Sequence, residues 1–270
     1  MRIVNLMENT NHNPQLQCEH GLSLYVELPN HRLLFDTGAS SAFAQNAALL
    51  GVDLALVDTA VLSHGHFDHG GGLGEFLRQN SVAPVYHQQS AFAFYCNRHH
   101  AYIGLDAGLS SHKQLVAVTG DHWIDSSLFL LNQVSGKILC PFSNQGLMMQ
   151  RAEALTPDDF IHEQSLVLCR PEGNVLLSGC SHRGVINILE AYQAVFGALP
   201  AAFIGGLHLK QESPYHPEEL DAIRQTGAYL RNLGIPIYTC HCTGLAAYDI
   251  LKFQLGSQLA YFSTGEELRL

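Results

Sequence analysis

The sequence predicts an α/β fold, and three observations lead to that class. Predicted strands alternate with predicted helices along most of the chain, which is the order typical of an α/β protein. The chain has 270 residues, which is enough for a large buried core. Hydrophobic residues make up 47% and charged residues 14%, a balance typical of a globular protein rather than a disordered one.

The first part of the chain predicts a strand, a hairpin, a helix and a buried strand in that order. Residues 2–7 are an apolar run, and residues 22–36 contain two β-rich runs joined by a Pro-Asn turn. A helix is expected at 41–50, because a serine can cap its start and a glycine can end it. The run 56–63 is expected to be a buried strand.

The same order returns later in the chain. Residues 165–182 predict a second hairpin with a Pro-Glu-Gly-Asn turn, and residues 185–196 predict a helix that a glycine ends. The resemblance between 23–40 and 165–182 indicates two related halves. Between them, at about 87–163, the pattern is irregular, and we expect an insertion that covers the active-site edge of a single domain spanning 1–270.

The last part of the chain continues the alternation. A strand is expected at 201–206, followed by a helix that begins at Pro217 and ends before a glycine. A strand at 235–239, a helix at 245–255 and a final strand near 259–263 complete the prediction.

Charge and cysteine content restrict the function and the compartment. The formal net charge of −10 disfavours a nucleic-acid binder, which would normally present a basic face. No signal peptide or membrane-spanning segment is recognisable, and the seven cysteines are scattered and odd in number, so we expect free thiols in the cytoplasm. Cys240-His241-Cys242 lacks a second cysteine pair, so a structural zinc finger is not expected. A homo-oligomer is compatible with the sequence.

A dense group of metal-ligand residues follows the strand at 56–63. His64, His66, Asp68 and His69 fall within six positions, before three glycines that allow the backbone to bend. Imidazole and carboxylate together suit zinc, and also iron or manganese. We therefore expect a site for one or two divalent metals, most simply zinc.

Three more histidines stand just beyond predicted strands, namely His182, His208 and His241. Ligands of α/β proteins bind outside the carboxyl ends of strands. Each of these histidines alone could be a hydrogen-bonded structural residue. Together with the 64–69 group, they predict one shared metal site.

The motif His64-x-His66-x-Asp68-His69, preceded by a strand and an Asp36-Thr37-Gly38 loop, resembles the metallo-β-lactamase-fold superfamily. The resemblance covers nearly the whole chain. Residues 19–23 (EHGLS), GCSH with GVINI, GGLHL and HCTG are similar to a subfamily that includes the dihydropterin-methyl-ribofuranosylaminobenzene-phosphate synthase. The resemblance implies an αββα sandwich with two metals at one edge.

The resemblance also implies roles for particular residues. His64 and His66 would bind the first metal, and Asp68, His69 and His241 the second, with Asp36 orienting the loop from behind. His182 is expected to complete the first metal site. Two departures from the family pattern remain: His162 is only a loose match to the usual third histidine, and Cys180 stands where an aspartate is usual, as a ligand or a buried thiol.

Together these features predict a metal-dependent hydrolase or transferase for a small anionic substrate, with a phosphate ester or diphosphate first. Asp68 and His208 are the candidate catalytic residues, and His20 is a candidate pocket residue. The alternatives are a hydrolase of carboxylic esters, thioesters or lactones, and a noncatalytic metal-binding or sensing module. A di-iron oxidoreductase is disfavoured because a histidine, His66, stands where such proteins have glutamate, and no flavin domain is present.

Overall fold

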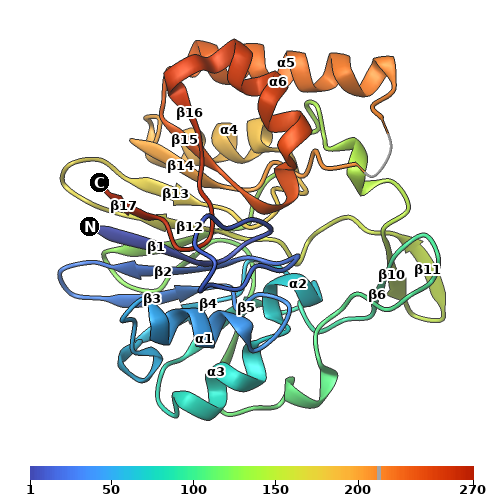
Figure 1. Ribbon diagram of the computed structural model, residues 1–270. Helices are drawn as coiled ribbons and strands as arrows, with labels where there is room; N and C mark the ends of the chain where they lie inside the picture. The colour runs from blue at the N-terminus through green and yellow to red at the C-terminus, as the bar shows by residue number, and fades with distance from the viewer. Residues whose placement is uncertain (212–213) are drawn as a thin grey trace. The chain divides into compact units, whose positions relative to one another are not determined.

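The computed structural model describes residues 1–211 and 214–270, and the chain divides into two compact units (Figure 1). The first unit comprises Met1–Thr119, Gly146–Gln164 and Ser263–Leu270. The second unit comprises Gly120–Gln145 and Ser165–Phe262. Each unit has its own seven-stranded sheet. The single domain expected from the sequence stays a prediction.

The sheet of the first unit has the strand order β17-β1-β2-β3-β4-β5-β7. Its strands are β1 (Arg2–Met7), β2 (Ser23–Glu27), β3 (Arg32–Phe35), β4 (Thr59–Val61), β5 (Val85–Gln88), β7 (Leu115–Val118) and β17 (Glu267–Arg269). Pairing is antiparallel from β17 to β3 and parallel from β3 to β7. A smaller sheet contains β6 (Tyr95–Cys96), β10 (Met148–Arg151) and β11 (Ala154–Pro157).

Helices cover one face of this first sheet. They are α1 (Ala42–Leu49), α2 (Phe67–Gly70) and α3 (Leu73–Gln79), with short 3₁₀ turns η1 (Leu54–Leu56) and η2 (Ala107–Leu109). The helices α1 and α3 lie on the same side of the sheet (Figure 1). They contribute the fully buried Phe43 and Phe76 to the core of this unit. Burying one such side chain stabilises the fold by about 1.5–3 kcal/mol.

The second unit repeats the combination of antiparallel and parallel pairing. Its sheet has the order β16-β15-β14-β13-β12-β9-β8. The strands are β8 (His122–Trp123), β9 (Leu128–Leu131), β12 (Ser165–Leu168), β13 (Val175–Leu177), β14 (Ala202–Gly205), β15 (Ile237–Thr239) and β16 (Leu259–Tyr261). Pairing is antiparallel from β8 to β13 and parallel from β13 to β16. In both units, therefore, a hairpin leads into parallel strands, in line with the two related halves expected from the sequence.

The helices of the second unit begin and end close to where the sequence predicts. They are α4 (Val185–Phe196), α5 (Pro217–Leu233) and α6 (Leu245–Leu255), with 3₁₀ turns η3 (Phe142–Asn144), η4 (His241–Thr243) and η5 (Gly256–Gln258). Gly197 and Gly234 end α4 and α5 in the left-handed region, with φ of 70° and 69°. Glycine adopts this conformation without the steric cost that a Cβ would bring.

The strand order decides where polar loops gather within each unit. In the first unit, the parallel strands β3 and β4 end just before Asp36 and Ser63. In the second unit, β13, β14 and β15 are parallel neighbours and end before the loops that carry His182, His208 and His241. Parallel neighbours end at the same edge of a sheet, so each unit collects its loops at one edge.

The irregular segment at about 87–163 contains more regular structure than its sequence indicates. It supplies β7 to the first unit's sheet and both β8 and β9 to the second unit's sheet. It also supplies β6, β10 and β11 to the small sheet. These strands are two to four residues long, which is too short for a clear alternation of apolar and polar residues.

Two further observations concern membrane-spanning helices and cysteines. Among the described residues, no helix combines the length and apolar character that crossing a membrane requires. All seven cysteines are free thiols, as the sequence predicts.

Candidate functional site

The first cluster of ligand-type side chains, defined as His64, His66, Asp68 and His69, lies in the first unit. The loop after β4 carries the first two, and α2 carries the others. All four residues are buried, and the His64 and His69 rings have centroids 4.1 Å apart. The structure thus brings together the four residues that the sequence singles out in this stretch.

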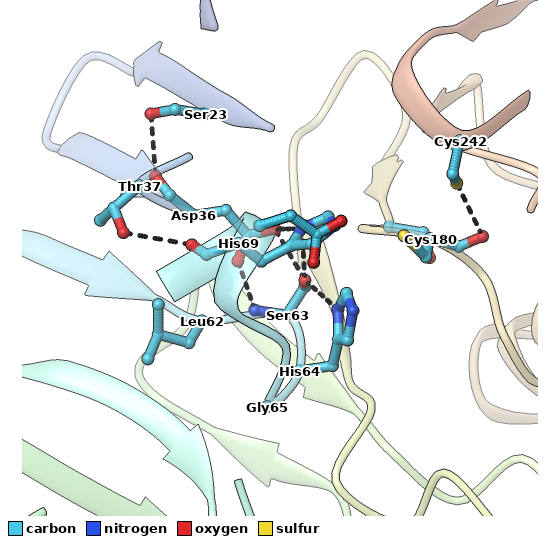
Figure 2. Close-up of polar contacts among 12 residues, drawn as sticks. Ser23, Asp36, Thr37, Leu62, Ser63, His64, Gly65, His69, Cys180 and Cys242 are labelled. Atoms are coloured by element: carbon cyan, nitrogen blue, oxygen red, sulfur yellow. Dashed lines mark hydrogen bonds and ion pairs between the residues drawn. The ribbon is translucent and has the colours of Figure 1, made fainter. Parts of the chain in front are cut away.

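Asp36 and Ser63 form hydrogen bonds with histidines of the first cluster (Figure 2). The Ser63 backbone N–H and hydroxyl both donate to the Asp36 carboxylate, at 2.6 Å each. Nδ1 of His69 lies 2.7 Å from Asp36 Oδ2, and Asp36 and His69 are fully buried. Asp36 thus forms hydrogen bonds with both Ser63 and His69, while its role in orienting a metal ligand stays a prediction.

This arrangement fixes which nitrogen of each ring carries the proton. A carboxylate only accepts, so His69 donates from Nδ1. The Ser63 hydroxyl gives its single proton to Asp36, so it accepts from Nδ1 of His64 at 2.8 Å. Both rings therefore keep the Nε2 lone pair, which is the form in which a neutral imidazole binds a metal.

The backbone is strained where these side chains are held. Asp36 has φ of 61°, and the other unit has Ser181, His208 and His241 at 59°, 49° and 50°. Residues with a Cβ adopt this region at a cost, and such strain gathers at functional sites. In the first unit, Asp36 is held in place by the Ser23 hydroxyl, which donates to its carbonyl at 2.9 Å (Figure 2).

His162 and Asp158 support the other side of the first cluster. The Gly65 backbone N–H donates to His162 Nδ1 at 2.9 Å, so His162 Nε2–H donates to Asp158 Oδ2 at 3.1 Å. Asp158 Oδ2 also lies 3.8 Å from His66 Nε2. Both histidine contacts lower the pKa of Asp158 although its burial opposes this, and burial lowers the pKa of His66.

His20 lies at the solvent side of the first cluster. Its Nε2 is 3.3 Å from Asp68 Oδ2, and its Nδ1 is 3.3 Å from the side-chain amide of Asn9. About half of the His20 side chain is exposed, at 49%. The neighbouring Glu19 accepts from the backbone N–H groups of Ala39 and Ser40, at 3.0 Å each, and so fixes the loop that carries His20. The role of His20 as a pocket residue stays a prediction.

The second cluster, defined as Cys180, His182 and His208, lies in the second unit. One ligand atom from each residue lies within 4.8 Å of the other two. The rings of His182 and His208 have centroids 4.1 Å apart. Asn144 holds His182 from both sides, since its amide donates to the His182 carbonyl at 2.7 Å and its side-chain oxygen lies 2.9 Å from Nδ1. His182 therefore keeps its Nε2 lone pair as well.

Cys242 and His241 lie beside the second cluster, on the turn η4. Cys242 is buried, and its thiol donates to the Cys180 carbonyl at 3.5 Å (Figure 2). Burial alone would raise the pKa of the Cys242 thiol. Hydrogen bonding with Cys180 and His208, together with the neighbouring charge of His241, holds that pKa well below its ordinary value.

The donor sets of both clusters fit a divalent metal. His64 and His69 in the first cluster, and His182 in the second, each have one ring nitrogen that is hydrogen-bonded to a neighbouring residue, which is the arrangement that metal-binding histidines show. In the second cluster, both ring nitrogens of His208 are buried, and the Cys242 thiol beside this side chain is only a weak hydrogen-bonding group. Buried polar atoms are nearly always paired, so this imidazole has capacity left for a bound ligand.

Sequence reasoning missed the residues that orient these side chains. Ser63, Asp158 and Asn144 are common polar residues with no distinctive spacing. Asn144 lies 38 positions from His182 in the sequence, so no local pattern connects them. Only the position of Ser63, directly between a buried strand and His64, gave a usable signal.

Comparisons with known proteins give a consistent result. Residues 16–103 match the family model described as the metallo-beta-lactamase superfamily. The chain is 26% identical to the 7,8-dihydropterin-6-methyl-4-(beta-D-ribofuranosyl)-aminobenzene-5'-phosphate synthase of Methanocaldococcus jannaschii, over 100% of this chain and 96% of that protein.

Solved structures are similar as well. One, described as Tm1679, a metal-dependent hydrolase of the beta-lactamase superfamily, has a TM-score of 0.83 and 30% identity. The match covers 100% of this chain and 99% of that one. A metallo-beta-lactamase fold protein, YhfI of Bacillus subtilis, has a TM-score of 0.56 and 11% identity over 99% of both chains, and it is similar in fold alone.

Proposed function

The chain belongs to the metallo-β-lactamase superfamily, and on that premise we propose that it is a metal-dependent enzyme. Its substrate, in this proposal, is a small molecule that carries a phosphate ester or diphosphate, and the reaction is hydrolysis or group transfer. The observation that carries the proposal is the Asp36 carboxylate, which fixes His69 directly and His64 through Ser63. A fully buried network of this kind serves to present two Nε2 atoms in fixed positions.

We assign metal binding to residues of both clusters and to His241, which lies beside the second cluster. The proposed ligands are His64, His66, Asp68, His69, His182 and His241. A bound divalent metal would supply Lewis-acid chemistry, polarising a phosphoryl oxygen and activating water for attack. The superfamily relation and the donor chemistry support zinc first, with manganese or iron as alternatives.

Side chains of this protein would orient the attacking water, contact the substrate and hold the metal. In this proposal, the Asp68 carboxylate, which lies 3.3 Å from His20 Nε2, accepts a hydrogen bond from the attacking water and orients it. His20 is half exposed and bonded to Asn9, so it can meet a substrate that enters from solvent. Burial lowers the pKa of His66, so its imidazole stays neutral at physiological pH and keeps an electron pair that can bind a metal.

Support for a phosphate-bearing substrate comes from the related synthase, whose name specifies a 5'-phosphate. The formal net charge of −10 does not oppose this assignment, because bound divalent cations would be the dominant local charges for an anionic substrate.

A panel assay of the full-length protein tests the proposal. The protein is stripped of metal, reloaded with zinc, manganese or iron, and offered phosphomonoesters, phosphodiesters, diphosphates, thioesters and lactones. We expect turnover of a phosphate substrate that requires the metal and falls by at least about 100-fold in Asp68→Asn. Turnover of lactones or thioesters alone would contradict the substrate class. Failure of every fully metallated form on every substrate would favour a noncatalytic metal-binding protein.

A further inference from the structure

We propose that Asn9 is a positioning residue, which holds the His20 ring with its Nε2–H toward Asp68. The C-terminal segment, defined as Ser263–Leu270, fixes the backbone of Asn9 for this role. The inference rests on the function proposed above and deepens it, because it makes His20 a hydrogen-bond donor for an anionic substrate. The sequence singled out His20, but neither Asn9 nor the C-terminal segment.

Both nitrogens of the His20 ring have a polar neighbour. Nε2 lies 3.3 Å from Asp68 Oδ2, and Nδ1 lies 3.3 Å from the side-chain Nδ2 of Asn9. A carboxylate only accepts hydrogen bonds, whereas an amide nitrogen only donates them. In the neutral ring, the proton therefore stays on Nε2, and Nδ1 accepts from Asn9. The two contacts thus set both the plane of the ring and its tautomer.

The C-terminal segment holds the residues on either side of Asn9. The Glu8 backbone N–H donates to Thr264 Oγ1 at 2.7 Å, and the Thr264 N–H donates to the Thr10 carbonyl at 3.0 Å. Glu8 and Thr264 are buried, at 0% and 2% exposed. Because both of its neighbours in the chain are bonded to one buried residue, Asn9 has little backbone freedom. Its amide therefore extends toward His20 from a fixed point.

Strand pairing attaches the C-terminal segment to the start of the chain (Figure 1). The strands β17 and β1 pair in antiparallel orientation. The pairing continues beyond β17, because the Asn5 N–H donates to the Glu266 carbonyl at 3.0 Å and the Gly265 N–H donates to the Asn5 carbonyl at 2.7 Å. Hydrogen-bonded residues thus follow one another from this strand pair up to Thr264.

The loop that carries His20 lies tightly against Asp68. The Leu22 N–H donates to the Asp68 carbonyl at 3.0 Å. A Cβ on Gly21 would lie 2.7 Å from the same carbonyl oxygen, so a larger residue would push the loop away. Since the backbone next to His20 is fixed in this way, the contact with Asn9 is what decides how the ring is turned.

The tautomer decides how His20 meets an anionic substrate. The side chain is 49% exposed, so a molecule that enters from solvent can reach it. With the proton on Nε2, the ring can donate to Asp68 or to a phosphate oxygen beside it. With the proton on Nδ1, a nitrogen lone pair would face the carboxylate and the anionic substrate, and both contacts would be repulsive. Asn9 thereby favours binding of the phosphate group.

NMR of the histidine ring nitrogens tests the inference without relying on catalysis. The full-length protein, with and without added zinc, carries isotope-labelled histidine and is measured at about pH 8, where ordinary imidazoles are neutral. Ring nitrogens with and without a proton differ widely in chemical shift, and His20→Gln identifies the His20 signals. We expect a protonated Nε2 in the wild type and a mixture of both tautomers in Asn9→Ala.

The matched control is Asn13→Ala, at an exposed residue of the same loop whose side chain accepts from the Gln15 N–H. This variant should show the tautomer of the wild type. A wild-type His20 with its proton on Nδ1 would overturn the inference, as would an Asn9→Ala variant with an unchanged tautomer. Either result would leave the proposed function standing.

Steady-state kinetics gives a second readout. In the panel assay, Asn9→Ala should raise KM for the phosphate substrate by at least about fivefold and leave kcat within about twofold, because substrate binding is what the contact supports. Asn13→Ala should leave both constants unchanged. A loss of kcat with an unchanged KM would contradict this role. If no form of the protein turns over any substrate, the proposed function fails, and the NMR result still decides how Asn9 acts on His20.

Thr264→Val tests the role of the C-terminal segment. Valine is similar in shape to threonine but cannot accept from the Glu8 N–H. We expect faster hydrogen exchange at the Glu8 amide and a mixture of His20 tautomers, whereas Thr264→Ser should resemble the wild type. Thr226→Val, at a buried threonine of α5 that donates to the Ala222 carbonyl, is the matched control.

The exchange of the Glu8 amide also gives the outcomes that count against the C-terminal segment. Unchanged exchange and an unchanged His20 tautomer in Thr264→Val would remove the segment from the proposal. If Thr264→Val fails to fold, the wild type decides, because a Glu8 amide that exchanges as fast as exposed loop amides would contradict its hydrogen bond to Thr264.

Discussion

Gly65 donates its backbone N–H to Nδ1 of His162 across 2.9 Å, although the two residues lie 97 positions apart in the sequence. The contact connects the loop between His64 and His66 to a histidine that the family pattern had suggested only loosely as a ligand. Since His162 Nε2 lies 3.1 Å from Asp158, the ring is held at both nitrogens. We infer that His162 positions the loop that carries His64 and His66.

Replacing His162 with alanine should destabilise the protein. The substitution leaves the buried Gly65 N–H without its acceptor and Asp158 without one of its donors, at a cost of about 1–3 kcal/mol. The free energy of unfolding in urea measures the effect. The exposed His99→Ala is the control, expected within about 0.5 kcal/mol of wild type. Equal stability of the two variants would refute the positioning role.

Asp36→Asn should weaken metal binding about 10–100-fold while keeping the backbone conformation. Asparagine tolerates the positive φ of 61°, but its NH2 group cannot accept, so it cannot keep all the hydrogen bonds that Ser63 and His69 donate to the two carboxylate oxygens. Zinc affinity, measured by competition with a chelator, reports the change. Asp53→Asn, at the N-cap of η1, is the control and should bind zinc like the wild type. An undiminished affinity in Asp36→Asn would show that this network does not orient ligands.

Gly65→Ala should be poorly tolerated on steric grounds. A Cβ at this position would lie 2.3 Å from the Ala91 carbonyl oxygen and 2.9 Å from a ring carbon of Tyr95. The resulting displacement should cost about 1–3 kcal/mol, read as a lower thermal midpoint. Gly74→Ala is the matched control, because its Cβ would meet only Leu109 at 3.8 Å in a helix that favours alanine. A thermal midpoint for Gly65→Ala equal to that of Gly74→Ala would contradict this packing.

Stability should fall with acid partly through His87. Burial lowers the pKa of this histidine in the folded protein, and its Nδ1 lies 2.9 Å from the Gln88 carbonyl. Below the unfolded pKa of about 6.5, the unfolded chain binds a proton that the folded chain does not, so stability is lost as pH falls. The slope from this group reaches at most about 1.4 kcal/mol per pH unit.

The comparison of thermal midpoints at pH 7.5 and pH 5.5 isolates this contribution. We expect His87→Gln to show a smaller acid-induced decrease than the wild type. His112→Gln, at a less buried histidine, should behave like the wild type. An identical decrease in all three proteins would exclude His87 as a source of the pH dependence.

The sequence predicted most of the fold because the longer elements carry their own signals. The helix α4 begins and ends as its apolar pattern and its following glycine indicate, and the predicted fold class is confirmed by a related structure with a TM-score of 0.83. The strands β8 and β9 were missed because segments of two and four residues carry too little periodicity. The strand β17 was missed for the same reason, and only its pairing with β1 defines it.

The candidate site was predictable where its residues are close in sequence. The stretch from His64 to His69 could be identified from the sequence, because several side chains of the metal-ligand type at short spacing are rare in a loop after a strand. Asp36 was found through a family resemblance. Asn144 and Asp158 were not found, because their roles depend on contacts between distant segments that no local pattern encodes.

The metal content of the full-length protein tests the central claim most directly. After equilibrium dialysis against zinc, elemental analysis should find stoichiometric metal in the wild type and in His99→Ala. His66→Ala, which lacks a proposed ligand but leaves the Asp36 network in place, should retain markedly less. Wild-type protein without bound metal, or a His66→Ala variant with as much metal as His99→Ala, would contradict the account.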